Sequence, residues 1–129
     1  MAGNDSRALH RINIAVGVTF AVFAALQLND PDPLIWILFY GAAAAACFAW
    51  GSVPPYWLWP AAVGLAALIW TGLLAPRVFP DLVLVDLVRP MDEKTPAIEE
   101  GREMLGLLIV AGWMVTLLVL SRRRRNAGR

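Results

Sequence analysis

Four long stretches without a formal charge divide the chain. They cover residues 12–28, 34–50, 53–76 and 104–120. A helix that crosses the hydrocarbon of a bilayer needs roughly 20 mostly apolar residues, with about 17 as the lower limit. Neither residues 42–46 nor residues 105–120 carry the polar stripe expected of a helix in a water-soluble bundle. The pattern therefore predicts an all-α fold, an integral membrane four-helix bundle.

Turn signals between these stretches set the expected helix limits. We expect one membrane domain of residues 1–129, with helices at about 8–29, 34–50, 55–75 and 96–121. Asp32 is placed to cap the second helix, with Pro33 at its first position, where a missing N–H costs nothing. The long connection, residues 76–95, contains an apolar but charged part, residues 80–90. We expect this part to lie on the membrane surface, and Thr95 to cap the last helix.

The distribution of charge orients the predicted bundle. Hydrophobic residues make up 59% of the chain and charged residues only 16%, against about 25% charged in soluble proteins. Arginines concentrate at the two ends, and cytoplasmic flanks of membrane helices are enriched in Lys and Arg. We therefore expect both termini to be cytoplasmic. The run Arg122–Arg125 directly follows an apolar stretch, which favours a topology anchor or an anionic-lipid contact over a nucleic-acid partner.

Small and aromatic residues in the apolar stretches suggest how the helices pack. Small residues allow close helix association in lipid, and they occur at Gly41, Ala45, Ala49, Gly64, Gly106 and Gly112. The pattern leaves open whether they contact helices of the same chain or other membrane subunits. Tryptophans near the ends of the stretches are typical of the aromatic belts at membrane surfaces; they are Trp36, Trp50, Trp57, Trp59 and Trp70.

The predicted topology brings two polar blocks to the outer side of the membrane. We call them together the mouth cluster: Asn29, Asp30, Asp32, Glu99, Glu100, Arg102 and Glu103. Ionisable groups at the membrane boundary are costly unless they are paired or hydrated, and they mark a functional-site hypothesis. Five carboxylates accompany a single arginine in this cluster. Negative charge therefore remains unless a proton or a cation neutralises it.

Three interpretations of the mouth cluster are open. In the first, Asp30 and Asp32 cap the turn and Arg102 pairs with a carboxylate. In the second, carboxylate oxygens bind a divalent cation such as calcium, magnesium or manganese; the candidate ligands are Asp30, Asp32, Glu99 and Glu103. In the third, a protonated carboxylate serves proton-linked transport or catalysis. The cluster contains no His or Cys, which disfavours zinc, copper and haem.

Both blocks resemble the signatures of a known family. The string Leu26-Gln27-Leu28-Asn29-Asp30-Pro31-Asp32, followed by Trp36 and Tyr40, is similar to one signature of the transmembrane protein 220 family. The string Glu99-Glu100-Gly101-Arg102-Glu103, followed by Gly106-Leu107 and Trp113, is similar to the other. The resemblance implies a small multi-pass membrane protein of an uncharacterised family and assigns no activity. The Ala- and Arg-rich composition favours a bacterial member in the inner (plasma) membrane.

These observations favour a non-enzymatic accessory or assembly subunit whose mouth cluster is a structural or ligand-binding site. The absence of a nucleophile–base pair from the sequence pattern argues against an enzyme. The bilayer is the expected partner, together with other membrane subunits at the small-residue helix faces. The alternative is a small carrier or membrane enzyme that uses Asp32, Glu99 and Glu103 for a cation, a proton or a lipid head group.

Overall fold

A computed structural model describes residues 2–29, 32–52, 54–55, 57–78 and 96–127. The side chains of residue 2, residues 77–78 and residues 96–100 are outside this description. Asp30, the predicted surface segment of residues 80–90 and the predicted cap Thr95 also lie outside the described residues.

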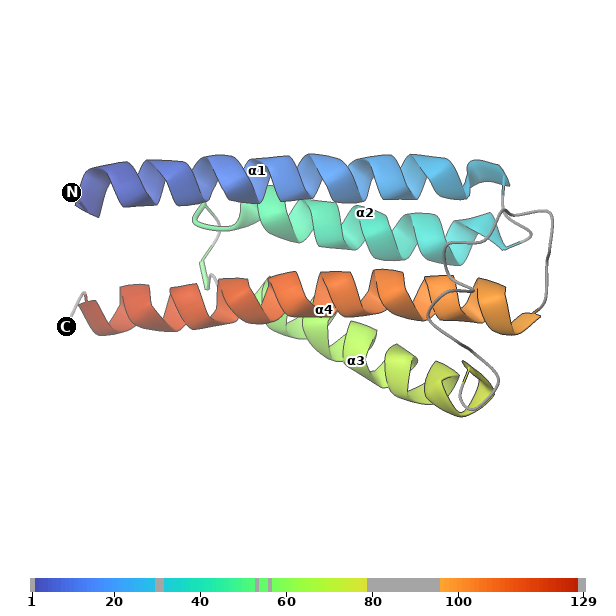
Figure 1. The fold of residues 1–129 in the computed structure, drawn as a ribbon. Helices are drawn as coiled ribbons and strands as arrows, with labels where there is room; N and C mark the ends of the chain where they lie inside the picture. Colours follow the sequence, from blue (N-terminus) through green and yellow to red (C-terminus); the bar gives the residue numbers. More distant parts are fainter. Residues whose placement is uncertain (1, 30–31, 53, 56, 79–95, 128–129) are drawn as a thin grey trace.

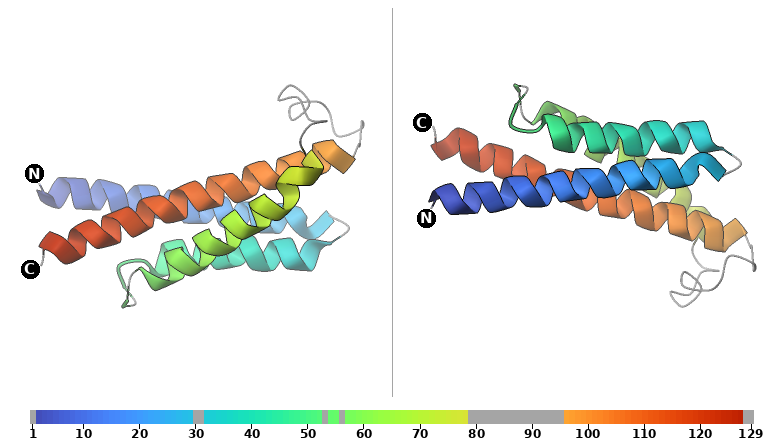
Figure 2. Two further views of the ribbon diagram at one scale, coloured as in Figure 1. Left: turned by 90° about the horizontal axis from the view of Figure 1, so that it is seen from below. Right: turned by 90° about the horizontal axis from the view of Figure 1, so that it is seen from above.

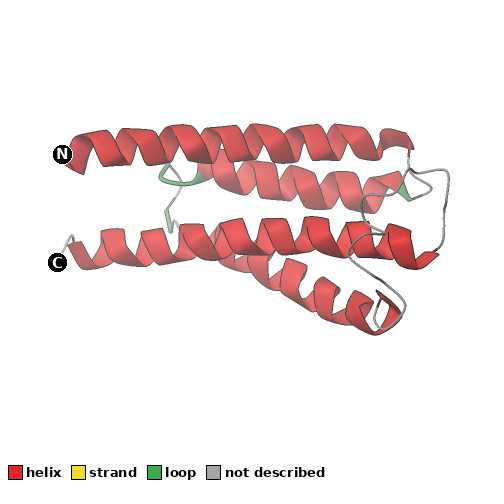
Figure 3. Cartoon of the chain, in the orientation of Figure 1, coloured by secondary structure: helices red, strands yellow, loops and turns green. Residues whose placement is uncertain are grey.

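The described part of the chain is built from helices joined by turns (Figure 3). They are α1 (Ala2–Leu26), the short 3-10 turn η1 (Gln27–Asn29), α2 (Pro33–Ala49), α3 (Leu58–Val78) and α4 (Pro96–Ala127). Consecutive α-helices run in opposite directions, so both termini lie at the same end of the bundle (Figure 1). We call this the terminal end and the opposite one the mouth end.

The lengths of the helices fit a membrane bundle. Three of them have segments long and apolar enough to cross a membrane. The fourth, α2, is apolar and has 17 residues, which is at the lower limit for a span. The predicted all-α membrane bundle is thus confirmed. Both α1 and α4 extend further toward the termini than the apolar stretches, because their polar and arginine-rich ends continue the helix.

Both ends of α2 are defined by local backbone chemistry. Pro33 occupies the start of the helix and Asp32 the capping position, as predicted, but the Asp32 side chain makes no capping hydrogen bond. At the other end, Gly51 has a φ of +85°, a conformation that favours glycine because it has no Cβ. The Ser52 N–H donates to the Ala49 carbonyl at 3.0 Å, which turns the chain toward α3.

The backbones approach each other most closely within two helix pairs, α1 with α2 and α3 with α4. Each pair contains a glycine at a tight contact. A Cβ atom at Gly17 would lie 2.7 Å from the Phe48 ring, and one at Gly64 would lie 3.1 Å from the Met114 Cβ. Small residues allow this approach in lipid. The predicted contact at Gly64 is therefore confirmed, and Gly17 is a contact that the sequence analysis did not identify.

Large aromatic side chains fill the space between the two pairs. The Trp36 ring of α2 stacks on the Trp70 ring of α3, with centroids 4.3 Å apart. Trp36 is only 5% exposed and Trp50 only 4%, so the prediction that these two are surface anchors is wrong. Trp57 and Trp59 are exposed at the terminal end of α3 and fit the predicted belt.

Asn13 is a fully buried polar residue that joins three helices. Its Nδ2 donates to the Cys47 carbonyl of α2 at 2.7 Å, and its Oδ1 accepts from Trp113 Nε1 of α4 at 3.0 Å. A third such bond lies nearby, in which Trp50 Nε1, at the end of α2, donates to Ser121 Oγ of α4 at 2.9 Å. Hydrogen bonds between membrane helices contribute about 0.6–2 kcal/mol each. The bonds from Trp113 to Asn13 and from Trp50 to Ser121 therefore hold the two pairs together near the terminal end.

We expect Asn13→Leu to lower the free energy of unfolding by about 1–3 kcal/mol, because the buried Trp113 N–H would lose its acceptor. Denaturation of the purified protein in mixed detergent micelles measures this change. Asn4→Leu is the matched control, since Asn4 is exposed on the same helix. Equal effects of the two substitutions would contradict the role given to Asn13.

Candidate functional site

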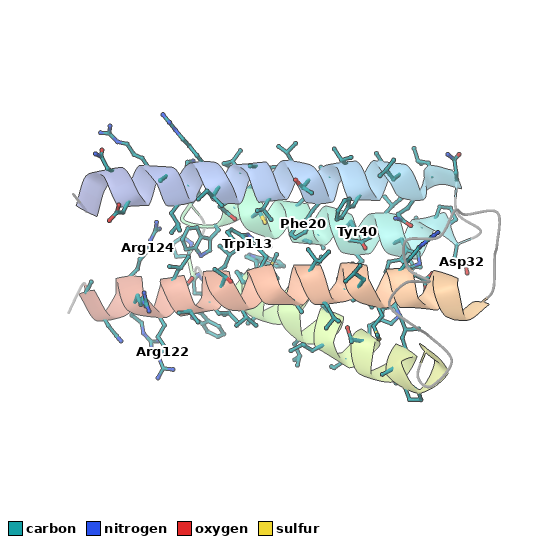
Figure 4. All side chains as sticks on the ribbon, viewed as in Figure 1. Phe20, Asp32, Tyr40, Trp113, Arg122 and Arg124 are labelled. Carbon is teal, nitrogen blue, oxygen red and sulfur yellow. The ribbon has the colours of Figure 1, made fainter. Side chains whose placement is uncertain are left out.

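The mouth end collects the chain segments that carry the mouth cluster. η1 ends there, and α2 and α4 both begin there (Figure 1). Figure 4 shows Asp32 at this end of the bundle. Asp30 lies outside the described residues, and for Glu99 and Glu100 the backbone in the first turns of α4 is described without the side chains. The described side chains of the cluster are those of Asn29, Asp32, Arg102 and Glu103.

Exposure separates these four side chains into two groups. Asn29 and Asp32 are exposed, whereas Arg102 and Glu103 are half-buried. Arg102 and Glu103 both have interaction partners. The charge of Glu103 also acts electrostatically on the hydroxyl of Tyr40. Arg102 and Glu103 therefore belong to the packed part of the bundle, whereas Asn29 and Asp32 lie at its exposed edge.

The contact between Tyr40 and Gly106 sets the relative depth of the cluster. The Tyr40 hydroxyl occupies the space into which a Cβ at Gly106 would project. At about 1.5 Å per residue, Asp32 lies about 12 Å from the level of this contact, whereas Glu103 lies only about 5 Å from it. Arg102 and Glu103 are thus deeper than Asp32 by about 7 Å on this helical rise.

The group that packs against Gly106 differs from the expected one. The sequence suggested that its lack of a side chain lets another backbone come close beneath the charges. The structure instead places the ring of Tyr40 against it. The glycine therefore makes room for a large aromatic side chain that reaches from one helix pair to the other.

An aromatic layer closes the bundle beneath the mouth cluster. Tyr40 packs edge-on against Phe23 of α1, with centroids 5.6 Å apart, and Phe20 is only 1% exposed. Figure 4 shows Phe20 and Tyr40 between the helices. One turn below Glu103, Leu107 on α4 is fully buried. Among the described residues, buried aromatic and apolar side chains therefore lie below the half-buried charges.

The structure describes only some of the candidate ligands of the predicted cation site. Within residues 2–29, 32–52, 54–55, 57–78 and 96–127, no three His, Cys, Asp or Glu residues are grouped closely enough to hold a metal ion. Two of the four candidate ligands, Asp30 and the side chain of Glu99, lie outside the described residues. The divalent-cation interpretation thus stays a prediction.

Sequence reasoning missed the polar contacts near the terminal end. Asn13 stands one residue inside an apolar stretch and carries no charge, so a search for charges passes over it. An amide within a membrane helix is nevertheless a recognised signal of bonding between helices. Arg124 was assigned to the predicted anchor, yet its guanidinium lies 4.3 Å from the Trp50 ring centroid. Such a cation–π contact links the end of α4 to the end of α2.

We expect Gly106→Ala to destabilise the bundle, because the added methyl group would occupy the position of the Tyr40 hydroxyl. The double variant Gly106→Ala/Tyr40→Phe should recover much of the loss, since it removes that hydroxyl. Unfolding in mixed micelles measures both. Gly112→Ala on the same helix is the control, as nothing lies within 4 Å of its added Cβ. It should be neutral or stabilising by up to about 1 kcal/mol through helix propensity. Additive effects of Gly106→Ala and Tyr40→Phe would count against the contact.

Comparison with known proteins identifies a family. The model of the family described as transmembrane family 220, helix, matches residues 19–119. This range contains the whole mouth cluster, Tyr40, Gly106 and Trp113, and it leaves Asn13 outside. No solved structure matches the chain. Because the match covers most of the sequence, this membrane protein belongs to transmembrane family 220.

Proposed function

We propose that the chain is a non-enzymatic accessory or assembly subunit of a bacterial inner membrane, with both termini in the cytoplasm. In this proposal the mouth cluster is a structural or ligand-binding site on the outer face. The observation that carries it is the aromatic layer directly beneath Arg102 and Glu103. A group bound at the mouth meets Tyr40, Phe20 and Leu107, whose side chains are almost fully buried.

The filled interior supports a fixed site over a transport path. Trp36 stacks on Trp70 and packs against Tyr40, with centroids 6.0 Å apart in the second contact. Opening a path from the mouth would separate these rings, which are worth about 0.5–1.5 kcal/mol a pair beyond their burial. The layer thus favours a bundle that keeps one arrangement.

The buried polar side chains are used for holding the bundle together. Asn13 and Ser121 are the buried polar residues in the described part of the chain, and both make hydrogen bonds to other helices. A carrier needs polar groups that exchange partners along its path. Here the polar groups bind neighbouring helices at the terminal end, which suits a structural subunit.

The outer surface of the bundle favours contact with lipid and with other membrane subunits. Large apolar side chains are exposed on all four helices, for example Val22, Leu38, Leu65 and Val119. Gly41 and Gly112 are also exposed, and nothing lies within 4 Å of the position of an added Cβ at either. Such small-residue sites allow a helix of another subunit to approach closely.

The position of Glu103 favours the alternative of a carrier or membrane enzyme. Glu103 is half-buried, and a carboxylate in such a place is a candidate for binding a proton or a cation. This function requires the aromatic layer to open, and it therefore predicts transport that depends on Glu103.

We expect Arg102→Ala to lower the thermal unfolding midpoint in detergent, because it removes the single arginine from a cluster of carboxylates of which Glu103 is half-buried. The matched control is Arg123→Ala, since Arg123 is exposed on the same helix. An unchanged midpoint for Arg102→Ala would contradict the structural role of the mouth cluster.

The proposal predicts that the protein transports neither protons nor divalent cations. The purified chain in liposomes, loaded with a pH-sensitive or a magnesium-sensitive dye, should dissipate an imposed gradient no faster than protein-free liposomes. Addition of an ionophore is the positive control, because it shows that the dye reports the loss of each gradient. Transport above this background that is lost in Glu103→Gln would overturn the proposal in favour of a carrier.

A further inference from the structure

An apolar groove lies between α2 and α3 in the half of the bundle near the terminal end. Its volume is about 530 Å³. Ala46 and Val63 form its buried floor, and exposed alanines form its walls; the lining is completed by Phe39, Ala42, Ala45, Ala49, Trp59, Ala62 and Ala66. The groove exists because α3 packs mainly on α4 rather than on α2 and because alanine side chains fill little space. The two helices diverge toward the mouth end (Figure 2).

The length of the groove matches one leaflet of a bilayer. From Phe39 to Ala49 the helix rises by about 15 Å, which is half of the hydrocarbon thickness of about 30 Å. At its deep end, Phe39 packs edge-on against Trp70, with centroids 5.6 Å apart. Beyond that point, large side chains such as Leu38 and Leu34 stand exposed on α2. The groove therefore ends near the middle of the membrane.

Positive charge gathers beyond the shallow end of the groove. The guanidinium of Arg124 lies over Trp50, the residue that follows Ala49 at the end of α2. Arg122, Arg123 and Arg125 are exposed on the same turns of α4. Figure 4 shows Arg122 and Arg124 on opposite sides of α4, with Arg124 directed toward α2. Trp57 and Trp59 are exposed at the start of α3, as suits the boundary between hydrocarbon and head groups.

We propose that this groove binds an anionic phospholipid from the leaflet at the terminal end. One acyl chain lies along the alanine walls from Ala49 to Phe39, and the phosphate faces the arginines of α4. An acyl chain suits the groove because the lining is apolar and one leaflet deep. A helix of a second copy is about 10 Å wide and would need a trough along the full membrane depth, which the exposed leucines beyond Phe39 interrupt.

Native mass spectrometry of the full chain, released from nanodiscs of phosphatidylglycerol mixed with phosphatidylcholine, tests the proposal. The wild-type protein should retain one phosphatidylglycerol about tenfold more than phosphatidylcholine, because each arginine near an anionic head group strengthens binding several-fold. Ala45→Phe fills the groove from the α2 wall and should abolish this retention. Ala25→Phe, at an exposed position on α1, is the matched control and should leave it unchanged.

Charge variants test the other half of the site. Replacing Arg122, Arg123 and Arg125 by Gln should remove the preference for phosphatidylglycerol, while Arg124 is kept because it packs on Trp50. The double variant Arg7→Gln/Arg11→Gln, on α1 at the same end, is the control. If both variants lost the preference for phosphatidylglycerol equally, general surface charge would explain that preference. This outcome would overturn the proposed site.

Further outcomes also decide the matter. If the circular dichroism spectrum shows that Ala45→Phe is no longer helical, Ala66→Phe replaces it as the test variant, because it fills the groove from the α3 wall. The comparison of head groups on the wild-type protein needs no variant, and equal retention of the two lipids would overturn the proposal. Unchanged retention in a folded groove-filling variant would do so too. A wild-type dimer that Ala45→Phe converts to a monomer would assign the groove to a second copy.

Discussion

The hydrogen bonds of Asn13 are the interaction on which the arrangement of the bundle depends. α1 packs on α2 and α3 packs on α4, and each of these pairs has a close backbone contact of its own. Between the pairs the backbones approach each other less, mainly where α2 meets α3, so side chains make most of the connections. The amide of Asn13 accepts from Trp113 of one pair while it donates to the Cys47 carbonyl within the other. In hydrocarbon no water competes for these groups, and the bonds therefore select one relative position of the two pairs.

The contacts between the pairs divide the bundle into zones along the membrane normal. Near the terminal end, tryptophan N–H groups donate to Asn13 and Ser121. Toward the mouth end, aromatic rings pack on one another and on Gly106. Above them lie the half-buried charges of Arg102 and Glu103. This order puts the rigid aromatic layer between the charges and the membrane centre, so the mouth cluster and the α2–α3 groove are independent sites on opposite halves of the molecule.

The sequence predicts the fold well and the details of packing poorly. Uncharged stretches of sufficient length identify all four helices, and Asp32-Pro33 places the start of α2. Hydropathy cannot tell which face of a helix meets its neighbours. Trp36 and Trp50 stand near helix ends, where a belt residue and a core residue look alike, and only the structure shows them buried. Gly106 could be recognised as a packing site, but its partner, Tyr40, comes from a helix 66 positions earlier in the chain. For the mouth cluster, the sequence pattern predicts that its segments lie at one end of the bundle. It does not predict that Glu103 lies deeper than Asp32.

The chain order of the partners in these bonds has a consequence for biosynthesis. Asn13 and Trp113 are 100 positions apart, and Trp50 and Ser121 are 71 apart. The first two helices can associate through Gly17 as soon as both are in the membrane, but Asn13 and Trp50 then still lack their partners on α4. Because the missing partners all belong to α4, which follows the other three helices in the chain, the two helix pairs can be joined by these bonds only after α4 has been made. A chain that stops before Trp113 keeps the first three helices but leaves the Asn13 Oδ1 without its donor and the Trp50 N–H without its acceptor, so such a chain carries unsatisfied polar groups inside the membrane.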